Sequence, residues 1–158
     1  MDSSFIAIML MLESSSVKER MEYSNLMKDG EHTLKLFNDM KQVTTYKDGK
    51  KHGKETYWYP IGQKASECFY IDNKLEGELT AWTEFGLVIQ QDNYKSDLLH
   101  GLSRVWNEEG QLESEIMFKH GKPSGKYTFY ENGVKVKEGV AEYSNDDSPY
   151  NFDNETVN

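Results

Sequence analysis

The sequence has little of what marks a secreted or membrane-spanning protein. It has a single cysteine, Cys68, among 158 residues, so no disulfide can form within the chain, and a reducing, cytoplasmic compartment is the simpler expectation. The longest apolar run covers residues 5–12, which is too short for a membrane-spanning helix of about 20 residues. No basic residue precedes this run and no small-residue cleavage site follows it, so we expect no signal peptide.

Positive charge is also scarce. The chain has 18 Lys and Arg residues against 27 Asp and Glu residues, which gives a net charge of −9. Residues 142–158 contain no Lys or Arg at all. Because nucleic acids are held mainly by basic side chains on their phosphates, we expect no nucleic-acid partner. Residues 144–158 are polar and acidic, which predicts a flexible tail.

Glycine is not abundant, but its positions repeat. Four glycines are spaced by 24 residues: Gly53, Gly77, Gly101 and Gly125. An aromatic residue lies seven positions before each of them: Tyr46, Tyr70, Tyr94 and Phe118. Another aromatic residue lies five positions after each: Trp58, Trp82, Trp106 and Tyr130. A regular period of this length predicts a repeat protein in which each copy is one supersecondary unit.

The turns of the repeat can also be predicted. Four positions before each repeated glycine stands a residue that tolerates a left-handed backbone: Gly49, Asn73, Asp97 and Gly121. A positive φ is therefore expected at the same turn of every copy. Nine positions after the repeated glycine, the first three copies have another glycine, whereas the fourth has Gly133 one position early. This difference predicts a one-residue deletion in the last turn.

Between these turns lie runs of strand-forming residues. We expect strands at residues 54–59, 63–71, 78–83, 87–95, 102–107, 111–119, 126–131 and 134–142. Short connections make consecutive strands antiparallel, so the predicted fold is an all-β repeat, an elongated antiparallel meander of β-hairpins. The repeat domain is expected to span residues 33–143, with a degenerate copy at 33–45 and four copies from residue 46. Residues 1–32 are expected to form a small N-terminal cap, either helical or irregular.

Side chains alternate between the two faces of a strand, so the repeat predicts two rows of apolar residues. The row of the three tryptophans and Tyr130 is expected to form the repeat core, together with the aromatic residues that precede the glycines. The neighbouring row contains Tyr57, Val105 and Phe129, points to the opposite face, and is the candidate surface for a partner. A single sheet cannot bury both faces by itself, so a further segment or a partner chain must cover one of them.

The histidines and the cysteine do not form a predicted catalytic or metal site. His52 and His100 share a turn position, but four strand spacings separate them by roughly 19 Å, which is too far to share one metal ion. Hydrogen bonding of each turn histidine to the backbone is the interpretation that we favour. Cys68 has no basic neighbour in its strand that would lower its pKa, so we interpret it as structural.

A column of carboxylates also has a structural interpretation. Glu67, Glu115 and Glu138 share one position of the repeat, with Gln91 in the same column. Paired carboxylates can perform acid–base catalysis, but a recurrence by repeat register favours cross-strand pairing with lysine. We therefore expect a protein that is not an enzyme and that uses neither a metal nor a cofactor.

At these positions the chain resembles the MORN-repeat family, in the variant form that occurs in proteins described as bacterial antitoxin components and in large DNA viruses. The motif runs from Tyr46 through His52 and Gly53 to Gly62, and it recurs at residues 94–110 and 118–133. The second copy departs most, with Glu76 at the position of His52. The resemblance covers about residues 46–139 and implies a single elongated sheet of hairpins. It implies no one activity, because such repeats occur in scaffolds, dimerisation modules and proposed lipid-binding proteins.

Three functions are compatible with these features. The first is a scaffold that binds a protein partner or associates with itself, which the repeat and the two apolar faces favour. The second is an antitoxin or immunity protein whose acidic tail masks a basic surface on a toxin. The third is a peripheral lipid-binding module, which the basic residues at 47–54 favour but the net negative charge disfavours.

Overall fold

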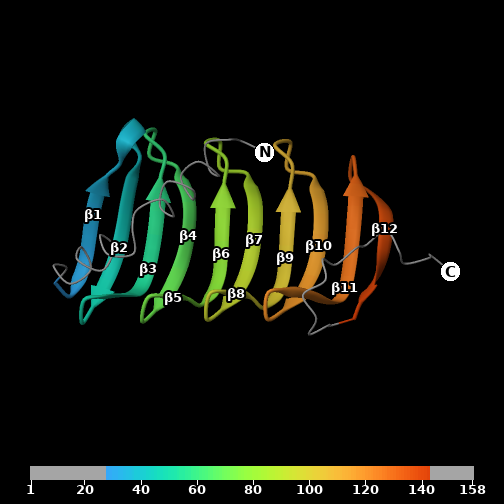
Figure 1. Cartoon of the computed structure of the whole chain (residues 1–158). Coiled ribbons are helices and arrows are strands. Elements are labelled where there is room, and N and C mark those ends of the chain that lie inside the picture. The colour runs from blue at the N-terminus through green and yellow to red at the C-terminus, as the bar shows by residue number, and fades with distance from the viewer. Residues whose placement is uncertain (1–27, 143–158) are drawn as a thin grey trace.

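The computed structural model describes residues 28–142 as one long antiparallel sheet (Figure 1). Ten strands follow one another in chain order, from β1 at one edge to β12 at the other, and the short strands β5 and β8 pair beside β4 and β7. The predicted meander of hairpins is therefore confirmed. The predicted acidic tail, and the predicted cap as far as residue 27, lie outside the described residues.

The strand boundaries follow the repeat closely. The first elements are β1 (Gly30–Lys35), the 3₁₀ turn η1 (Phe37–Asp39), β2 (Lys41–Lys47), β3 (Lys50–Trp58) and β4 (Lys64–Ile71). The middle elements are β5 (Lys74–Leu75), β6 (Gly77–Trp82), β7 (Val88–Lys95), β8 (Leu98–Leu99) and β9 (Gly101–Trp106). The last are β10 (Leu112–Lys119), β11 (Lys122–Glu131) and β12 (Val134–Ala141). All eight predicted strands are present.

The turns at the lower edge of the sheet in Figure 1 connect one copy to the next. Each places two consecutive residues at positive φ: Asp48-Gly49, Asp72-Asn73, Ser96-Asp97 and His120-Gly121. Two central residues at positive φ are typical of type I′ turns, whose twist matches that of the strands they join. The predicted positive φ at the second position is confirmed in all four copies, and the first position adds a requirement that the sequence pattern did not reveal.

The turns at the upper edge are of a different type in the first three copies. In the first, the Tyr59 N–H donates to the Gln63 carbonyl at 2.8 Å, and the Gly62 N–H donates to the Tyr59 carbonyl at 2.9 Å. The second and third copies repeat both bonds. In the fourth copy, Asn132 and Gly133 have φ values of 51° and 74°, so a shorter two-residue turn replaces this loop. The predicted one-residue deletion is confirmed.

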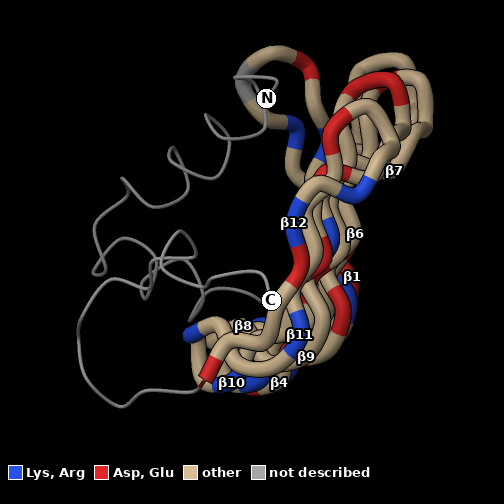
Figure 2. Tube along the Cα trace, turned by 90° about the vertical axis from the view of Figure 1, so that its right-hand side faces the viewer, with Lys and Arg blue, Asp and Glu red and all other residues tan. Residues whose placement is uncertain are grey.

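The repeated glycines mark a local offset between neighbouring strands. Thr44 faces Glu55, but Tyr46 faces Lys51. Between these two pairs, the single residue Thr45 of β2 lies opposite three residues of β3, 52–54, with Gly53 in the middle. Gly53 has a φ of 115°, and a Cβ at this position would lie 3.1 Å from the Cβ of Thr45. Glycine is therefore required both by the backbone conformation and by the close approach of β2. Figure 2, seen along the sheet, shows that the hairpins bend toward their lower ends.

The sheet contains a fifth hairpin, formed by β1 and β2. Gly30 has a φ of 117° and faces Tyr46, just as Gly53 faces Tyr70. Gly30 lies one residue late for the 24-residue spacing. The missing residue is a bulge residue, because β1 and β2 pair without the register shift that β3 and β4 have between Tyr57 and Trp58. The regular sheet therefore begins at Gly30, inside the segment that was predicted as a cap, and the copy expected at 33–45 is a complete hairpin.

Strand pairing assigns every side chain to one of two faces. We name them by the adjacent residues Tyr57 and Trp58. The tyrosine face carries Tyr57, Ala81, Val105 and Phe129 with their cross-strand neighbours. The tryptophan face carries Trp58, Trp82, Trp106 and Tyr130. The predicted separation of the two rows onto opposite faces is confirmed.

Candidate functional site

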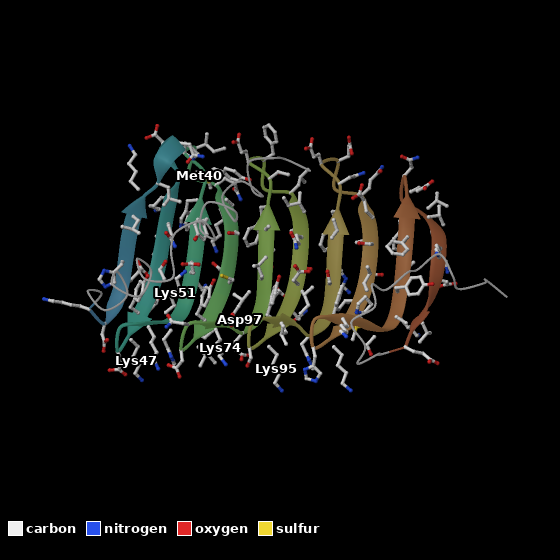
Figure 3. The ribbon with its side chains drawn as sticks, viewed as in Figure 1. Met40, Lys47, Lys51, Lys74, Lys95 and Asp97 are labelled. Carbon is white, nitrogen blue, oxygen red and sulfur yellow. The ribbon has the colours of Figure 1, made fainter. Side chains whose placement is uncertain are left out.

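The tyrosine face is the more deeply buried of the two. Ala81 is 0% exposed, Tyr127 is 1% exposed and Tyr57 is 6% exposed. At the upper end of the first copies, a hydrophobic cluster combines Tyr57 and Met40 with Tyr59, Ala65 and Leu36. Met40 lies at this upper end in Figure 3. This face therefore supplies most of the core of the described residues.

A buried carboxylate is fully compensated on the tyrosine face. Glu55 is 2% exposed, and one of its oxygens, Oε2, accepts three hydrogen bonds. The donors are Gln42 Nε2, Thr44 Oγ1 and Lys51 Nζ, each at 2.7 Å. The Lys51 ammonium also lies 4.7 Å from the centre of the Tyr70 ring. This cluster, which joins β2, β3 and β4, keeps the charge of Glu55 balanced inside the sheet.

A second buried carboxylate is not balanced in this way. Asp92 is also 2% exposed, and its Oδ2 accepts a hydrogen bond from Gln90 Nε2 at 2.6 Å. Its Oδ1 has no hydrogen-bond partner. The Tyr94 hydroxyl lies 3.5 Å from Oδ2, and burial together with the charge of Asp92 raises the pKa of Tyr94 to about 12. Asp92 is thus a buried charge with an unfilled acceptor.

The predicted partner-binding row does not form an open surface. Tyr57 is buried, accepts a hydrogen bond from Gln42 Nε2 at 2.9 Å, and has a pKa raised by burial and by the charge of Glu55. The prediction is therefore wrong for Tyr57, because its side chain is packed inside the fold. Val105 and Phe129 are half-buried, and for these two residues partner binding stays a prediction.

The row that was predicted as core is the more open one. Trp58, Trp82, Trp106 and Tyr130 are all half-buried, so none of them is a fully enclosed core residue. Among the aromatic residues before the glycines, Tyr46 is buried, whereas Tyr70, Tyr94 and Phe118 are half-buried. The assignment was wrong in degree because regular spacing reveals a shared structural position but not how much of each ring is covered.

The tryptophan face combines aromatic rings with charged side chains. Lys41 Nζ lies 5.0 Å from the centre of the Trp58 ring, and Lys64 Nζ lies 5.7 Å from Trp58 and 5.9 Å from Trp82. These distances are typical of cation–π contacts. The indole N–H of Trp58 is shielded from solvent and has no hydrogen-bond partner. Lys64 therefore links the aromatic rings of two successive copies.

The carboxylate column pairs with basic residues on this face, but the predicted cross-strand pairing with lysine is found only between Lys54 and Glu67. Glu67 is bonded by Lys64 Nζ at 2.7 Å and by Lys54 Nζ at 3.1 Å. Burial alone would raise the pKa of Glu67, but the hydrogen bonds from Lys64 and Lys54 outweigh it and hold the pKa below its usual value. In later copies, Arg104 Nε donates to Glu115 at 2.8 Å, which is arginine in place of the expected lysine, and Lys135 lies 2.8 Å from Glu138 in the same strand.

A shallow hollow of about 250 Å³ opens between the first and second copies. Its lining combines an aromatic wall with both signs of charge: Lys54, Glu67, Cys68, Phe69, Glu78, Thr80 and Trp82. Phe69 is 43% exposed at its rim. The hollow therefore presents aromatic and charged groups side by side on the tryptophan face.

The lower turns are tied to one another by bonds that the repeat pattern did not reveal. Asn73 Oδ1 accepts from the Lys51 N–H at 2.8 Å, and the Asn73 N–H donates back to the Lys51 carbonyl at 2.9 Å. Asp97 makes the same pair of bonds with Leu75, at 2.8 and 3.1 Å. At this turn position, Asn73 and Asp97 therefore both adopt a positive φ and accept a hydrogen bond through a short side chain. Figure 3 shows Asp97 with Lys47, Lys74 and Lys95 along these turns.

The histidines make contacts with neighbouring turns. His52 Nδ1 lies 3.5 Å from Asp72 Oδ1, and the rings of His100 and His120 are 5.1 Å apart. Neither His52 Nδ1 nor His100 Nδ1 has a hydrogen-bond partner, so these nitrogens do not make the predicted backbone bond. His32 Nε2 lies 2.6 Å from the Lys28 carbonyl. Within residues 28–142, no three His, Cys, Asp or Glu side chains are grouped so that they could hold a metal ion.

Cys68 is not arranged as a nucleophile. It is buried on the tyrosine face at 8% exposure, and burial together with the charge of Glu55 raises the pKa of its thiol to about 12. A catalytic cysteine needs the opposite shift, because the thiolate is the reactive form. The position therefore supports the structural interpretation. In the part of the chain that the structure covers, no helix is long and apolar enough to cross a membrane.

Comparison with known proteins agrees with the geometry. The family described as MORN repeat variant matches residues 51–72 and 99–120. Both matches begin two residues before a repeated glycine and run through a complete hairpin, and they are separated by two 24-residue periods. No curated protein matches the chain. The repeated turns, the paired strands and the family match agree, and together they support a MORN-repeat protein whose two matched segments are repeats of the variant type.

Proposed function

We propose that this protein is a non-enzymatic scaffold that binds a protein partner through its tryptophan face. The observation that carries the proposal is the row of half-buried aromatic side chains on a face against which no other strand of residues 28–142 packs. Trp58, Trp82 and Trp106 recur at every second strand, so the row runs along the sheet instead of closing into a pocket. Large half-exposed aromatic side chains are the residues that most often dominate protein interfaces.

The surroundings of the row favour a protein partner over a small molecule. The hollow beside Trp82 is shallow and combines Lys54 with Glu67 and Glu78, so it fits a mixed surface better than one charged ligand. The ion pairs of Glu67 and Glu115 hold the charged side chains close to the aromatic row. A partner can therefore contact rings and charges together, as in the core and rim of an interface.

The proposal can be tested by replacing two rings of the row. Trp82→Ala with Trp106→Ala should remove most of the partner that tagged protein captures from its native source, measured by quantitative mass spectrometry. Phe85→Ala is the matched control, because Phe85 is 91% exposed at an upper turn and lies off the row. It should leave capture unchanged. Far-UV circular dichroism should show that all three proteins keep the sheet.

Two outcomes would contradict the proposal. Equal capture by the wild type and the double variant would show that the tryptophan face is not the binding surface. Binding to anionic vesicles that depends on the exposed lysines at 47 and 50, with no protein captured, would replace the scaffold by a lipid-binding function.

A further inference from the structure

The two edges of the sheet are complementary halves of a contact that the molecule already makes four times. Each hairpin joins the next through one pair of strands: β2 with β3, β4 with β6, β7 with β9, and β10 with β11. β12 is equivalent to the strand that is named first in each pair (β2, β4, β7 and β10), because Ala141 faces Gly125 as Tyr70 faces Gly53. β1 is equivalent to the strand that is named second (β3, β6, β9 and β11), because Gly30 occupies the place of the repeated glycines.

Both edge strands leave one side unpaired among residues 28–142. β12 also carries three valines that are more than half exposed: Val134 at 65%, Val136 at 51% and Val140 at 58%. On β1, Leu34 is 36% exposed. An edge strand with unpaired backbone groups and exposed apolar side chains is a template for another strand.

We propose that β12 of one molecule pairs with β1 of a second copy, so that the sheet continues from end to end. The register follows from the contacts within the chain. Glu67 faces Thr80, and Glu115 faces Thr128. Each glutamate lies three residues before the repeated aromatic residue of its strand, and each threonine lies three residues after the repeated glycine of its strand. The same rule places Glu138 opposite Thr33 of the second copy. The edges thus carry the glutamate and the threonine that pair at two of the four internal contacts.

The neighbouring positions are also compatible with this register. Ser66 faces Ala81, and Ser114 faces Phe129, on the tyrosine face. By the same rule, Lys137 lies opposite Leu34 of the second copy, where the aliphatic part of the lysine can cover the leucine. The exposed valines of β12 then lie at a junction between two sheets instead of in water. The inference uses the edges of the sheet and stands independently of the proposed function of the tryptophan face.

This contact has a definite consequence for assembly. It joins two different surfaces, so every added molecule presents a fresh edge at each end, and growth does not stop at a dimer. Pairing of β12 with β12 of another copy would instead use one surface twice and would stop at two molecules. The average mass in solution therefore distinguishes the two arrangements.

The experiment is a disulfide test of the register. Thr33→Cys and Glu138→Cys are made as separate full-length proteins, mixed, and oxidised at neutral pH. Directly opposed residues of antiparallel strands have Cα atoms about 4.5–5.5 Å apart, which lies within the range that a disulfide spans. We expect a cross-linked heterodimer from the mixture. The wild type is the blank, because Cys68 is buried and its pKa of about 12 keeps the thiol protonated.

A register control uses the same strand and the same face. Glu31→Cys lies two residues from Thr33, about 7 Å along the strand, and should cross-link to Glu138→Cys at least tenfold more slowly. Light scattering should show an average mass that rises with protein concentration beyond that of a dimer. A wild-type mass that stays at one molecule throughout would overturn the inference, as would equal cross-linking of Glu31→Cys and Thr33→Cys. Cross-linking of Glu138→Cys only to itself, with a mass limit of two, would show pairing of β12 with β12.

Discussion

Tyr57 and Trp58 are neighbours in β3, but their side chains lie on opposite faces of the sheet and in different surroundings. Tyr57 is 6% exposed beside a hydrogen-bonded carboxylate, whereas Trp58 is half-buried beneath two lysines. The buried face carries polar residues such as Gln42, Thr44 and Glu55, and the open face carries all three tryptophans. Burial in this protein therefore does not follow hydrophobicity residue by residue. It depends on which face a position joins.

The largest expected effect comes from truncating one ring on each face. Tyr127 is 1% exposed on the tyrosine face, so Tyr127→Ala should lower the free energy of unfolding by about 3–5 kcal/mol. Trp106→Ala removes a larger ring that is half-buried, and it should cost only about 2 kcal/mol. Urea titrations followed by circular dichroism measure both. A larger loss for Trp106→Ala would contradict the assignment of the core to the tyrosine face.

The second expected effect concerns the balanced carboxylate. Glu55→Ala removes the common acceptor of Gln42, Thr44 and Lys51, which leaves a buried amide and a partly buried ammonium without their partner. We expect a loss of about 2–4 kcal/mol in the free energy of unfolding. The double variant Glu55→Ala with Lys51→Met should recover part of this loss, because it also removes the unpaired charge. A loss below about 1 kcal/mol would show that the cluster is not a structural element.

The third effect is a loss of stability in alkali, again from the tyrosine face. The thiol of Cys68 has a pKa of about 12 in the fold, against about 9 in the unfolded chain. Between these values the unfolded state releases a proton that the folded state keeps, so stability falls as the pH rises. One such group contributes up to about 1.4 kcal/mol per pH unit. Urea titrations at pH 8, 9, 10 and 11 should show the decline.

The matched control for the alkaline effect is Cys68→Ser, which does not titrate in this range. It should reduce the slope of stability against pH above pH 9, while the tyrosines with raised pKa values, such as Tyr94, keep the rest of the decline. An identical slope in the wild type and in Cys68→Ser would show that the thiol is not shielded from water in the folded protein.

Much of this fold could be predicted from the sequence because the backbone requirements are local and repeated. Positive φ at Asn73 and Asp97 follows from the residue types, and the early Gly133 predicts the shorter last turn. The fifth hairpin was not fully predicted, since Gly30 lies one residue late and the missing residue belongs to a bulge, which has no glycine signal. A fixed spacing finds copies that keep their length and misses one that does not.

The assignment of the faces was harder to predict for a different reason. Alternation placed Tyr57 and Trp58 on opposite faces, but nothing in the alternation indicates which face is covered. The carboxylate of Glu55 and the amide of Gln42 look like surface residues in the sequence, and they are buried because they satisfy one another. Such a mutual arrangement becomes visible only when the strands are paired in register.

The fourth prediction separates the two buried carboxylates of the tyrosine face. Asp92 has the same exposure as Glu55, but its Oδ1 has no partner. Asp92→Thr, which places the residue type of Thr44 in the same column, should raise the free energy of unfolding by about 1 kcal/mol, because it removes a buried carboxylate oxygen that has no partner and keeps an acceptor for Gln90. The measurement is a urea midpoint beside that of Glu55→Ala. A loss of stability would show that Asp92 has a favourable partner in the folded protein.

The smallest effect is expected on the tryptophan face, where the ion pairs lie in contact with water. Arg104 and Glu115 are joined at 2.8 Å, but their side chains are 40% and 29% exposed. Arg104→Ala should therefore lower the free energy of unfolding by only about 0.2–1 kcal/mol, and this loss should shrink at 0.5 M salt. If the tryptophan face serves a partner, the same variant should weaken binding more than it weakens the fold. A loss of stability as large as that of Glu55→Ala would remove the distinction between a buried, structural face and an open, binding face.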